Sequence, residues 1–166
     1  LDKHKTVDDY PFGGGAGMLM KPDVLSLAIE SELAKEEVKP LIILTSARGF
    51  TFNQKIANDL STLSQRVIYI IAGRFEGVDE RLIEYYDIVE ISLGQFVLFG
   101  GEVAALAIME SVIRMIPDVL GNKETHLEES YALGTEFENL MEYPQYTKPK
   151  EWKGREVPDV LTSGNH

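Results

Sequence analysis

The sequence contains no cysteine and only three histidines. The absence of cysteine excludes a disulfide framework, a thiolate nucleophile and a cysteine-bound metal. His4, His126 and His166 lie far apart in the chain, so no zinc site is expected from them. No apolar run approaches the roughly 18 residues of a membrane span, and no signal peptide opens the chain. We therefore expect a cytoplasmic protein with no membrane partner.

Positive charge is also scarce. The chain has 16 lysines and arginines against 27 aspartates and glutamates, which gives a formal net charge of −11. Such a charge repels a nucleic-acid backbone at long range, so taken alone it argues against an RNA partner. In other respects the composition is ordinary, because 166 residues with 44% hydrophobic side chains suit one domain, or one domain and a fragment of another.

Helical and strand-like patterns alternate along the first 116 residues. Helices are expected over about 22–33, 53–64, 79–85 and 102–116, and strands over 41–44, 67–71 and 87–92. The last helix is apolar over most of its surface and is expected to be mostly buried. This alternation predicts an α/β fold with a mostly parallel sheet flanked by helices. From about residue 117 the periodicity fades, and three prolines indicate an extended, loop-rich segment.

Three glycine-containing loops follow the predicted strands, over 45–50, 72–77 and 93–101. In open parallel sheets, ligands bind beyond the carboxyl ends of the strands, where these loops would lie. The loop 93–101 holds five apolar residues, four of them between Gly94 and Gly100. We expect it to be buried, with its backbone groups satisfied by a ligand such as a purine ring, unless it is a misassigned strand.

Other motifs allow two interpretations each. Residues 13–17 could cradle a phosphate with backbone amides or form a plain flexible turn. Residues 73–77 could be a solvated turn with an Arg74–Glu76 pair, or a ligand loop in which Glu76 accepts hydrogen bonds and Arg74 contacts an anion. Arg114, near the end of the apolar helix, could simply complement the helix macrodipole.

Several blocks together resemble the bacterial tRNA (guanine-N1)-methyltransferases. They are His4-Lys5-Thr6-Val7-Asp8-Asp9, Pro11-Phe12-Gly13-Gly14-Gly15-Ala16-Gly17-Met18, Gly73-Arg74-Phe75-Glu76-Gly77-Val78-Asp79-Glu80-Arg81, Leu98-Phe99-Gly100-Gly101-Glu102, Glu156-Val157-Pro158 and Ser163-Gly164-Asn165-His166. Each block is weak by itself. Their order and their spread over nearly the whole chain make the resemblance specific.

The resemblance implies a SPOUT-class fold with a deep trefoil knot, which no pattern argument would have found because knots are very rare. It implies that residues 1–125 form the cofactor-binding knot domain without its first strand. Residues 126–166 would then be a loop-rich segment leading to an absent C-terminal tRNA-binding domain. The implied enzyme is a homodimer that binds S-adenosylmethionine and methylates N1 of the guanine 3′ of the anticodon in tRNA. A phosphate grip in the absent domain would reconcile the acidic chain with an RNA substrate.

The resemblance also implies roles for particular residues. Glu129 occupies the position of the proposed base, where an aspartate is usual, and Arg114 matches the catalytic arginine. The implied cofactor-binding residues are Ser46, Ala47, Gly73, Glu76, Leu93, Gly94, Gln95, Phe96, Val97, Leu98, Gly100 and Gly101. A helper magnesium ion is suggested for the family, but the sequence offers no ligand cluster that would locate it.

Two other functions compete with this interpretation. One is a different SPOUT methyltransferase that acts on ribosomal RNA or on a tRNA ribose, and locating the methylated atom separates it from the first. The other is a nucleotide-binding or dimerisation module without catalysis, which Glu129 in place of aspartate keeps open.

Overall fold

The computed structural model describes residues 6–63, 67–121 and 129–163. The chain divides into two compact units, residues 1–123 and 124–166. Whether these units are the knot domain and the loop-rich segment expected from the sequence stays a prediction. We describe each unit by itself.

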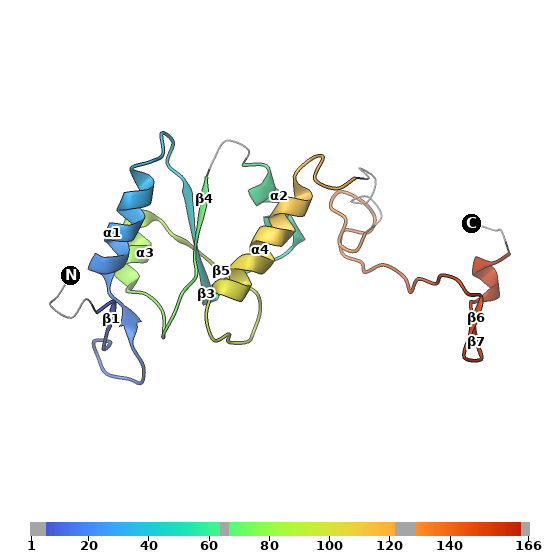
Figure 1. The fold of residues 1–166 in the computed structure, drawn as a ribbon, viewed down its shortest axis with the longest axis horizontal. Coiled ribbons are helices and arrows are strands. Elements are labelled where there is room, and N and C mark those ends of the chain that lie inside the picture. Colours follow the sequence, from blue (N-terminus) through green and yellow to red (C-terminus); the bar gives the residue numbers. More distant parts are fainter. Residues whose placement is uncertain (1–5, 64–66, 122–128, 164–166) are drawn as a thin grey trace. The chain divides into compact units, whose positions relative to one another are not determined.

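The first unit is built on a parallel three-stranded sheet. β3 (Leu41–Thr51) lies in the middle, between β4 (Ile68–Ile71) and β5 (Val89–Ser92) (Figure 1). β3 starts with four apolar residues in succession, which is typical of a strand covered on both faces. Its side chains therefore point alternately into two separate cores. The α/β class with a mostly parallel sheet is confirmed.

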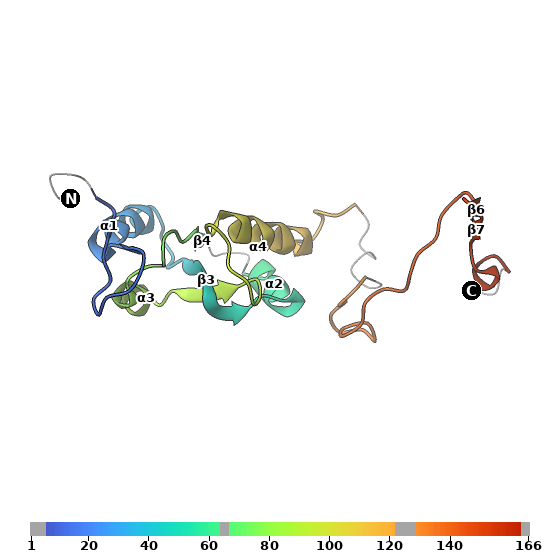
Figure 2. The same ribbon diagram turned by 90° about the horizontal axis from the view of Figure 1, so that it is seen from below.

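Helices cover both faces of this sheet, as Figures 1 and 2 show. On one face, α1 (Pro22–Leu33) and α3 (Glu80–Tyr86) pack on Ile42 and Leu44 of β3. On the other face, α2 (Gln54–Ser61) and α4 (Glu102–Met115) enclose the fully buried Ile43. Alternate residues of β3 thus pack into opposite cores. A shift of one residue would exchange the two sets of side chains, so this alternation fixes the register of the sheet.

Two of the helices begin at side-chain caps. Asn53 caps α2 by accepting a hydrogen bond from the Ile56 amide at 3.0 Å, and Asp79 caps α3 by accepting one from the Arg81 amide at 3.0 Å. Each cap satisfies an amide that has no partner within its own helix.

β3 makes an excursion at its carboxyl end. Thr45 pairs with Ile91 of β5, and Phe50 pairs with the same Ile91 five residues later. Residues 46–49 therefore bulge out of the ladder, although the strand resumes after them. The loop expected over 45–50 is thus an excursion within one long strand. Its residues lie at the same edge of the sheet as the loops after β4 and β5.

An N-terminal hairpin lies against the loop that follows β4. β1 (Asp8–Asp9) pairs antiparallel with β2 (Leu19–Met20), and the chain between them holds the four glycines. Met20 continues the contact with a bridge to Val78 and a 2.9 Å hydrogen bond from its amide to the Gly77 carbonyl. Residues 8–20 therefore form a hairpin that contacts the loop after β4.

The outer face of α4 departs from the sequence-based expectation. Ala104 and Ile108 are buried, but Val103, Leu106 and Met109 are 62%, 64% and 45% exposed. The prediction of a mostly buried helix is wrong for this unit, because only one side of the helix meets the sheet. The other side presents an apolar stripe.

The second unit has little regular structure, as its prolines indicate. Residues 130–142 form a closed loop, in which the Tyr131 amide donates to the Leu140 carbonyl and the Glu142 amide donates to the Ser130 hydroxyl, both at 2.9 Å. The chain then runs extended to a small hairpin of β6 (Glu151–Trp152) and β7 (Arg155–Glu156), followed by a 3₁₀ turn over Asp159–Leu161.

Candidate functional site

A cavity of about 460 Å³ lies in the first unit at the carboxyl ends of the three strands. All three glycine loops expected there contribute to its wall: the β3 excursion, the loop after β4 and the loop after β5. Its size falls in the range of sites for cofactors and drug-sized ligands. The predicted meeting of three loops at one sheet edge is therefore confirmed, while their function as a ligand site stays a prediction.

Ten of the twelve cofactor residues implied by the resemblance line this cavity. They are Ser46, Ala47, Gly73, Glu76, Leu93, Phe96, Val97, Leu98, Gly100 and Gly101. The other two, Gly94 and Gln95, belong to the same loop but do not line the cavity. The Gly94 amide instead donates to the Ser92 hydroxyl at 3.2 Å, and the Ser92 hydroxyl donates back to the Gly94 carbonyl at 3.1 Å. These two bonds fix the start of the loop.

Thr45 lines the cavity; it begins the loop predicted over 45–50 but is not among the cofactor-binding residues that the resemblance implies. Its hydroxyl, on a residue only 8% exposed, donates to the Ile71 carbonyl at 3.3 Å and accepts from the Gly73 amide at 3.4 Å. It therefore ties the point where β3 begins its excursion to the end of β4. The only signal in the sequence is a hydroxyl residue at the end of an apolar strand, which is too common to single out.

Gly101 packs against this same point. A Cβ built on Gly101 would overlap the Thr45 hydroxyl and lie 2.6 Å from the Gly73 nitrogen. The Gly101 amide also donates to the Gly73 carbonyl at 2.9 Å. Only glycine allows this approach, which brings the loop after β5 against the loop after β4 and closes the cavity floor.

Glu76 is held in the cavity wall from behind. A Cβ on Gly17, whose φ is +84°, would lie 2.6 Å from a Glu76 carboxylate oxygen. The Glu76 amide donates to the Met18 carbonyl at 2.9 Å. The glycine-rich hairpin therefore serves here as a backbone support for the Glu76 loop, and neither a phosphate cradle nor a flexible turn is needed to explain Gly17.

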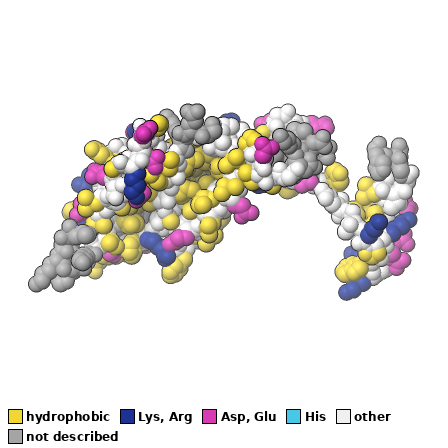
Figure 3. Space-filling view, turned by 45° about the horizontal axis from the view of Figure 1, so that its top comes forward, with side chains coloured by type: hydrophobic (Ala, Val, Ile, Leu, Met, Phe, Trp, Pro, Cys, Tyr) yellow, Lys and Arg dark blue, Asp and Glu magenta, His cyan; other side chains and the backbone are white. Residues whose placement is uncertain are grey.

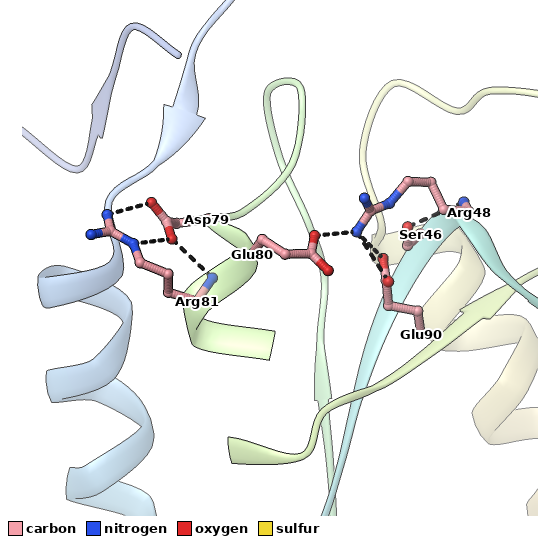
Figure 4. A network of polar contacts seen from close by, with 6 residues as sticks. All are labelled: Ser46, Arg48, Asp79, Glu80, Arg81 and Glu90. Atoms are coloured by element: carbon pink, nitrogen blue, oxygen red, sulfur yellow. Dashed lines mark hydrogen bonds and ion pairs between the residues drawn. The ribbon is translucent and has the colours of Figure 1, made fainter. Parts of the chain in front are cut away.

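An ion-pair network lies along the β3 excursion, as Figure 4 shows. Arg48 Nη2 donates to Glu80 at 2.7 Å and to Glu90 at 3.1 Å, and the Arg48 amide donates to the Ser46 hydroxyl at 3.2 Å. The hydrogen bond with Glu80, together with the charge of Glu90, raises the pKa of Arg48 above its ordinary value. All three charged residues line the cavity. Arg48 thus links the excursion to α3 and β5.

Arg74 forms a second ion pair at the cavity. Its Nε donates to Glu102 at 2.7 Å, joining the loop after β4 to the first turn of α4. The Arg74–Glu76 pair considered from the sequence does not form; Glu76 faces Gly17 instead. The sequence could not distinguish the two carboxylates, because the true partner is 28 residues away.

The apolar loop 93–101 is open to solvent, contrary to expectation. Phe96, Val97 and Phe99 are 54%, 87% and 100% exposed. The expectation of a buried loop is wrong for this unit, because the loop borders the cavity from one side and no other described element of the unit covers it. We expected burial because the backbone groups of the loop need hydrogen-bond partners. The Ser92 hydroxyl provides partners for the Gly94 amide and carbonyl.

Of the two catalytic residues implied by the resemblance, Arg114 is not among the residues that line the cavity, and Glu129 belongs to the second unit. Arg114 is half-buried in the last turn of α4, and Glu129 is half-buried in the second unit. Both make contacts within the structure. Their part in the site stays a prediction.

Neither a metal cluster nor a membrane helix is found in the described residues. Within residues 6–63, 67–121 and 129–163, no group of three histidine, aspartate or glutamate side chains is arranged to hold a metal ion. In the same ranges, no helix is long and apolar enough to cross a membrane.

The fold and the cavity define a class: an α/β domain with a cavity where three loops meet at the carboxyl edge of a parallel sheet. Comparison with known proteins makes this specific. The family model described as tRNA (guanine-1)-methyltransferase TrmD matches residues 1–166. The chain belongs to this family.

Individual relatives agree. The chain is 48% identical over 165 residues to a tRNA (guanine-N(1)-)-methyltransferase of Ehrlichia canis, covering 99% of the chain and 67% of the relative. It is 48% identical to the protein of that name from Clostridium botulinum over 100% of the chain and 66% of the relative. For the Bacillus licheniformis protein the values are 47%, 99% and 65%. The chain thus spans about two thirds of the length of these relatives.

Proposed function

We propose that the protein transfers a methyl group from S-adenosylmethionine to N1 of the guanine 3′ of the anticodon in tRNA. The observation that carries this proposal is the match to the methyltransferase family over all 166 residues. Relatives named for the same reaction align along essentially the whole chain. The cavity at the sheet edge supplies the place where the cofactor would bind.

The cavity suits S-adenosylmethionine in its chemistry. The cofactor combines a cationic sulfonium and ammonium with a carboxylate and an adenine ring. The wall combines the carboxylates of Glu76 and Glu90, the guanidiniums of Arg48 and Arg74, and the apolar loop that contains Phe96. Opposite charges and an apolar surface are therefore within reach of each part of the cofactor.

When bound, S-adenosylmethionine supplies an electrophilic methyl group on its sulfonium sulfur. The residues of the three cavity loops would hold the cofactor and orient its methyl group toward guanine N1. The Glu129 carboxylate accepts the N1 proton, because neutral N1 is a poor nucleophile. The Arg114 guanidinium stabilises the negative charge that develops on the guanine oxygen.

The enzyme works as a homodimer in this proposal. The exposed stripe of α4, which includes Val103, Leu106 and Met109, is an apolar surface on an otherwise strongly acidic chain. A second copy that covers the stripe would remove it from water and would bring a second Arg114 helix close to the first. The trefoil knot, a helper magnesium ion and a cytoplasmic location also stay predictions of family membership.

The decisive experiment combines cofactor binding with identification of the product. We expect the chain to bind S-adenosylmethionine saturably by calorimetry and to ignore ATP. A version extended to the full length of the relatives should methylate a tRNA transcript with guanine 3′ of the anticodon, and mass spectrometry should place the methyl on N1. A matched transcript with adenine at that position should stay unmethylated. A methyl on another atom, or on ribosomal RNA alone, would overturn the proposal in favour of another methyltransferase of the class.

A further inference from the structure

The only markedly basic stretch of this acidic chain lies in the second unit, over residues 143–155. Four cations against one carboxylate give this stretch a net charge of +3, while the whole chain carries −11. Every residue in it is exposed. It also holds the single tryptophan, Trp152, which is 60% exposed, and two tyrosines, Tyr143 and Tyr146, at 71% and 52%. We refer to residues 143–155 as the basic-aromatic tract.

The cations of the tract are available for a partner. In the described part of the first unit, ion pairs with carboxylates are formed by six lysines and arginines: Lys35, Lys39, Arg48, Lys55, Arg74 and Arg81. Among the described residues, none of the tract cations, Lys148, Lys150, Lys153 and Arg155, has a carboxylate within 4.0 Å. In the described part of the chain, carboxylates therefore neutralise the charge of the six paired cations but not the charge of the tract cations.

The two faces of the hairpin at the end of the tract carry opposite charges. Trp152 is paired with Arg155, and Glu151 is paired with Glu156. Residues directly opposite in a two-stranded ladder share one face, so one face is aromatic and basic and the other is acidic. Lys153, with φ +52° at the tight turn, places its Nζ 4.9 Å from the centre of the Trp152 ring. Figure 3 shows basic and hydrophobic side chains together on this hairpin, with acidic ones along its other edge.

We propose that the basic-aromatic tract binds a single-stranded or looped segment of RNA. Lysines 148, 150 and 153 and Arg155 contact the phosphates, while Trp152 and the tyrosines stack on unpaired bases. Interleaved cations and exposed aromatic rings suit single-stranded nucleic acid, because every base offers a face for stacking and every phosphate a charge. A protein partner would need a buried apolar core, and the rings here are separated along an extended chain. That the RNA is tRNA rests on the proposed function.

Two sets of lysine variants test the electrostatic half. Lys148→Gln, Lys150→Gln and Lys153→Gln are combined in one protein, and Lys35→Gln, Lys39→Gln and Lys55→Gln, all exposed but ion-paired, form the matched control. With a tRNA transcript, we expect the tract variant to bind about tenfold more weakly at about 0.1 M salt. Its slope of log affinity against log salt should fall by about 2, since each lost phosphate contact removes about 0.7 from the slope. The control should keep the wild-type slope. Equal slopes in the two variants would overturn the proposal.

The sole tryptophan tests the stacking half directly. Saturation with a single-stranded oligonucleotide should quench Trp152 fluorescence, and a fully double-stranded RNA of the same length should quench it much less. Unchanged fluorescence at saturation, or equal quenching by an acidic protein, would contradict an RNA-stacking role. S-adenosylmethionine affinity, measured on the same variants, should not change. A methyl on another atom, with the tract variant still defective in RNA binding, would refute the proposed function and leave the tract proposal standing.

Discussion

At the scale of single residues, the buried Thr45 hydroxyl does the most to bring the cavity loops together. It bonds to both Ile71 and Gly73, and it lies directly against Gly101. These contacts join the start of the β3 excursion, the end of β4 and the loop after β5 at one point. We therefore expect a change confined to this hydroxyl to lower ligand affinity more than it lowers the free energy of unfolding.

We expect Thr45→Val to weaken S-adenosylmethionine binding by about threefold to tenfold, which corresponds to about one hydrogen bond. Valine keeps the shape of threonine but leaves the Gly73 amide without its side-chain acceptor. Thr45→Ser, which keeps the hydroxyl, should bind nearly as well as wild type. Calorimetric titration measures both, with unfolding in urea as the control for stability. Equal affinity of the two variants would assign Thr45 to packing alone.

The implied base Glu129 is tested by turnover. In a version extended to the length of the relatives, we expect Glu129→Gln to lower kcat by about 10²-fold or more, because the amide cannot take the N1 proton. Cofactor affinity should stay within about twofold of wild type. Glu136→Gln, exposed in the closed loop that follows Glu129, is the control and should keep turnover. Wild-type turnover in Glu129→Gln would remove Glu129 from the base role.

At the scale of secondary structure, the periodicities predicted the type and order of the elements well. The continuous apolar run at 41–44 identified a strand covered on both faces, and α1 to α4 lie close to their predicted ranges. The excursion in β3 could not be predicted, because the pairing of both Thr45 and Phe50 with Ile91 depends on a distant strand. The predictions for the outer face of α4 and for the cavity loop were wrong for the same reason. An apolar sequence indicates that a segment is to be covered, but it does not say whether the same chain or a binding partner covers it.

The start of α3 makes a pH-dependent prediction. Arg81 donates two side-chain hydrogen bonds to Asp79, at 2.8 Å each, and these hold the pKa of Asp79 below its ordinary value. A lowered carboxyl pKa in the folded state stabilises the fold above the ordinary pKa of about 3.9, and this stabilisation is lost as the pH falls through the lowered value.

We therefore expect Arg81→Gln to reduce the free energy of unfolding at pH 7 by a small but measurable amount, as is usual for a largely exposed pair. The difference from wild type should disappear in acid, once Asp79 is protonated. In an Asp79→Asn background, which keeps a capping oxygen, the Arg81→Gln change should have no effect at pH 7. Urea unfolding across the pH range measures this, and a difference that persists in strong acid would contradict the assignment.

At the scale of the whole molecule, charge and apolar surface are unevenly distributed. A chain with a net charge of −11 carries an apolar stripe on α4, an exposed cavity loop and one basic-aromatic tract. The net charge alone argues against an RNA partner, but it averages over a local excess of positive charge in residues 143–155. Composition reports the sum, whereas a binding surface depends on where the unpaired charges lie.

The apolar stripe predicts the effect of a charge on self-association. We expect Leu106→Glu to convert a dimer into a monomer, because a carboxylate would be buried without a partner at the contact. Leu27→Glu on α1 is the matched control, since Leu27 is 58% exposed against 64% for Leu106. It should leave the assembly unchanged. Sedimentation of both variants at the same protein concentration measures this, and a dimeric Leu106→Glu would place the interface elsewhere.

The β3 excursion has a consequence for how this pocket can change over evolution or in the laboratory. Thr45 and Phe50 of β3 both pair with Ile91 of β5. The number of residues between Thr45 and Phe50 therefore does not affect how β3 pairs with β5 before and after the excursion. Gly49 must stay, because a Cβ there would overlap the backbone of Glu90 and Ile91. Insertions or deletions within 46–48 can therefore reshape one wall of the cavity without shifting a strand or exchanging its two faces. A library that varies the length and sequence of this short stretch could alter ligand preference while the two cores keep the same packing.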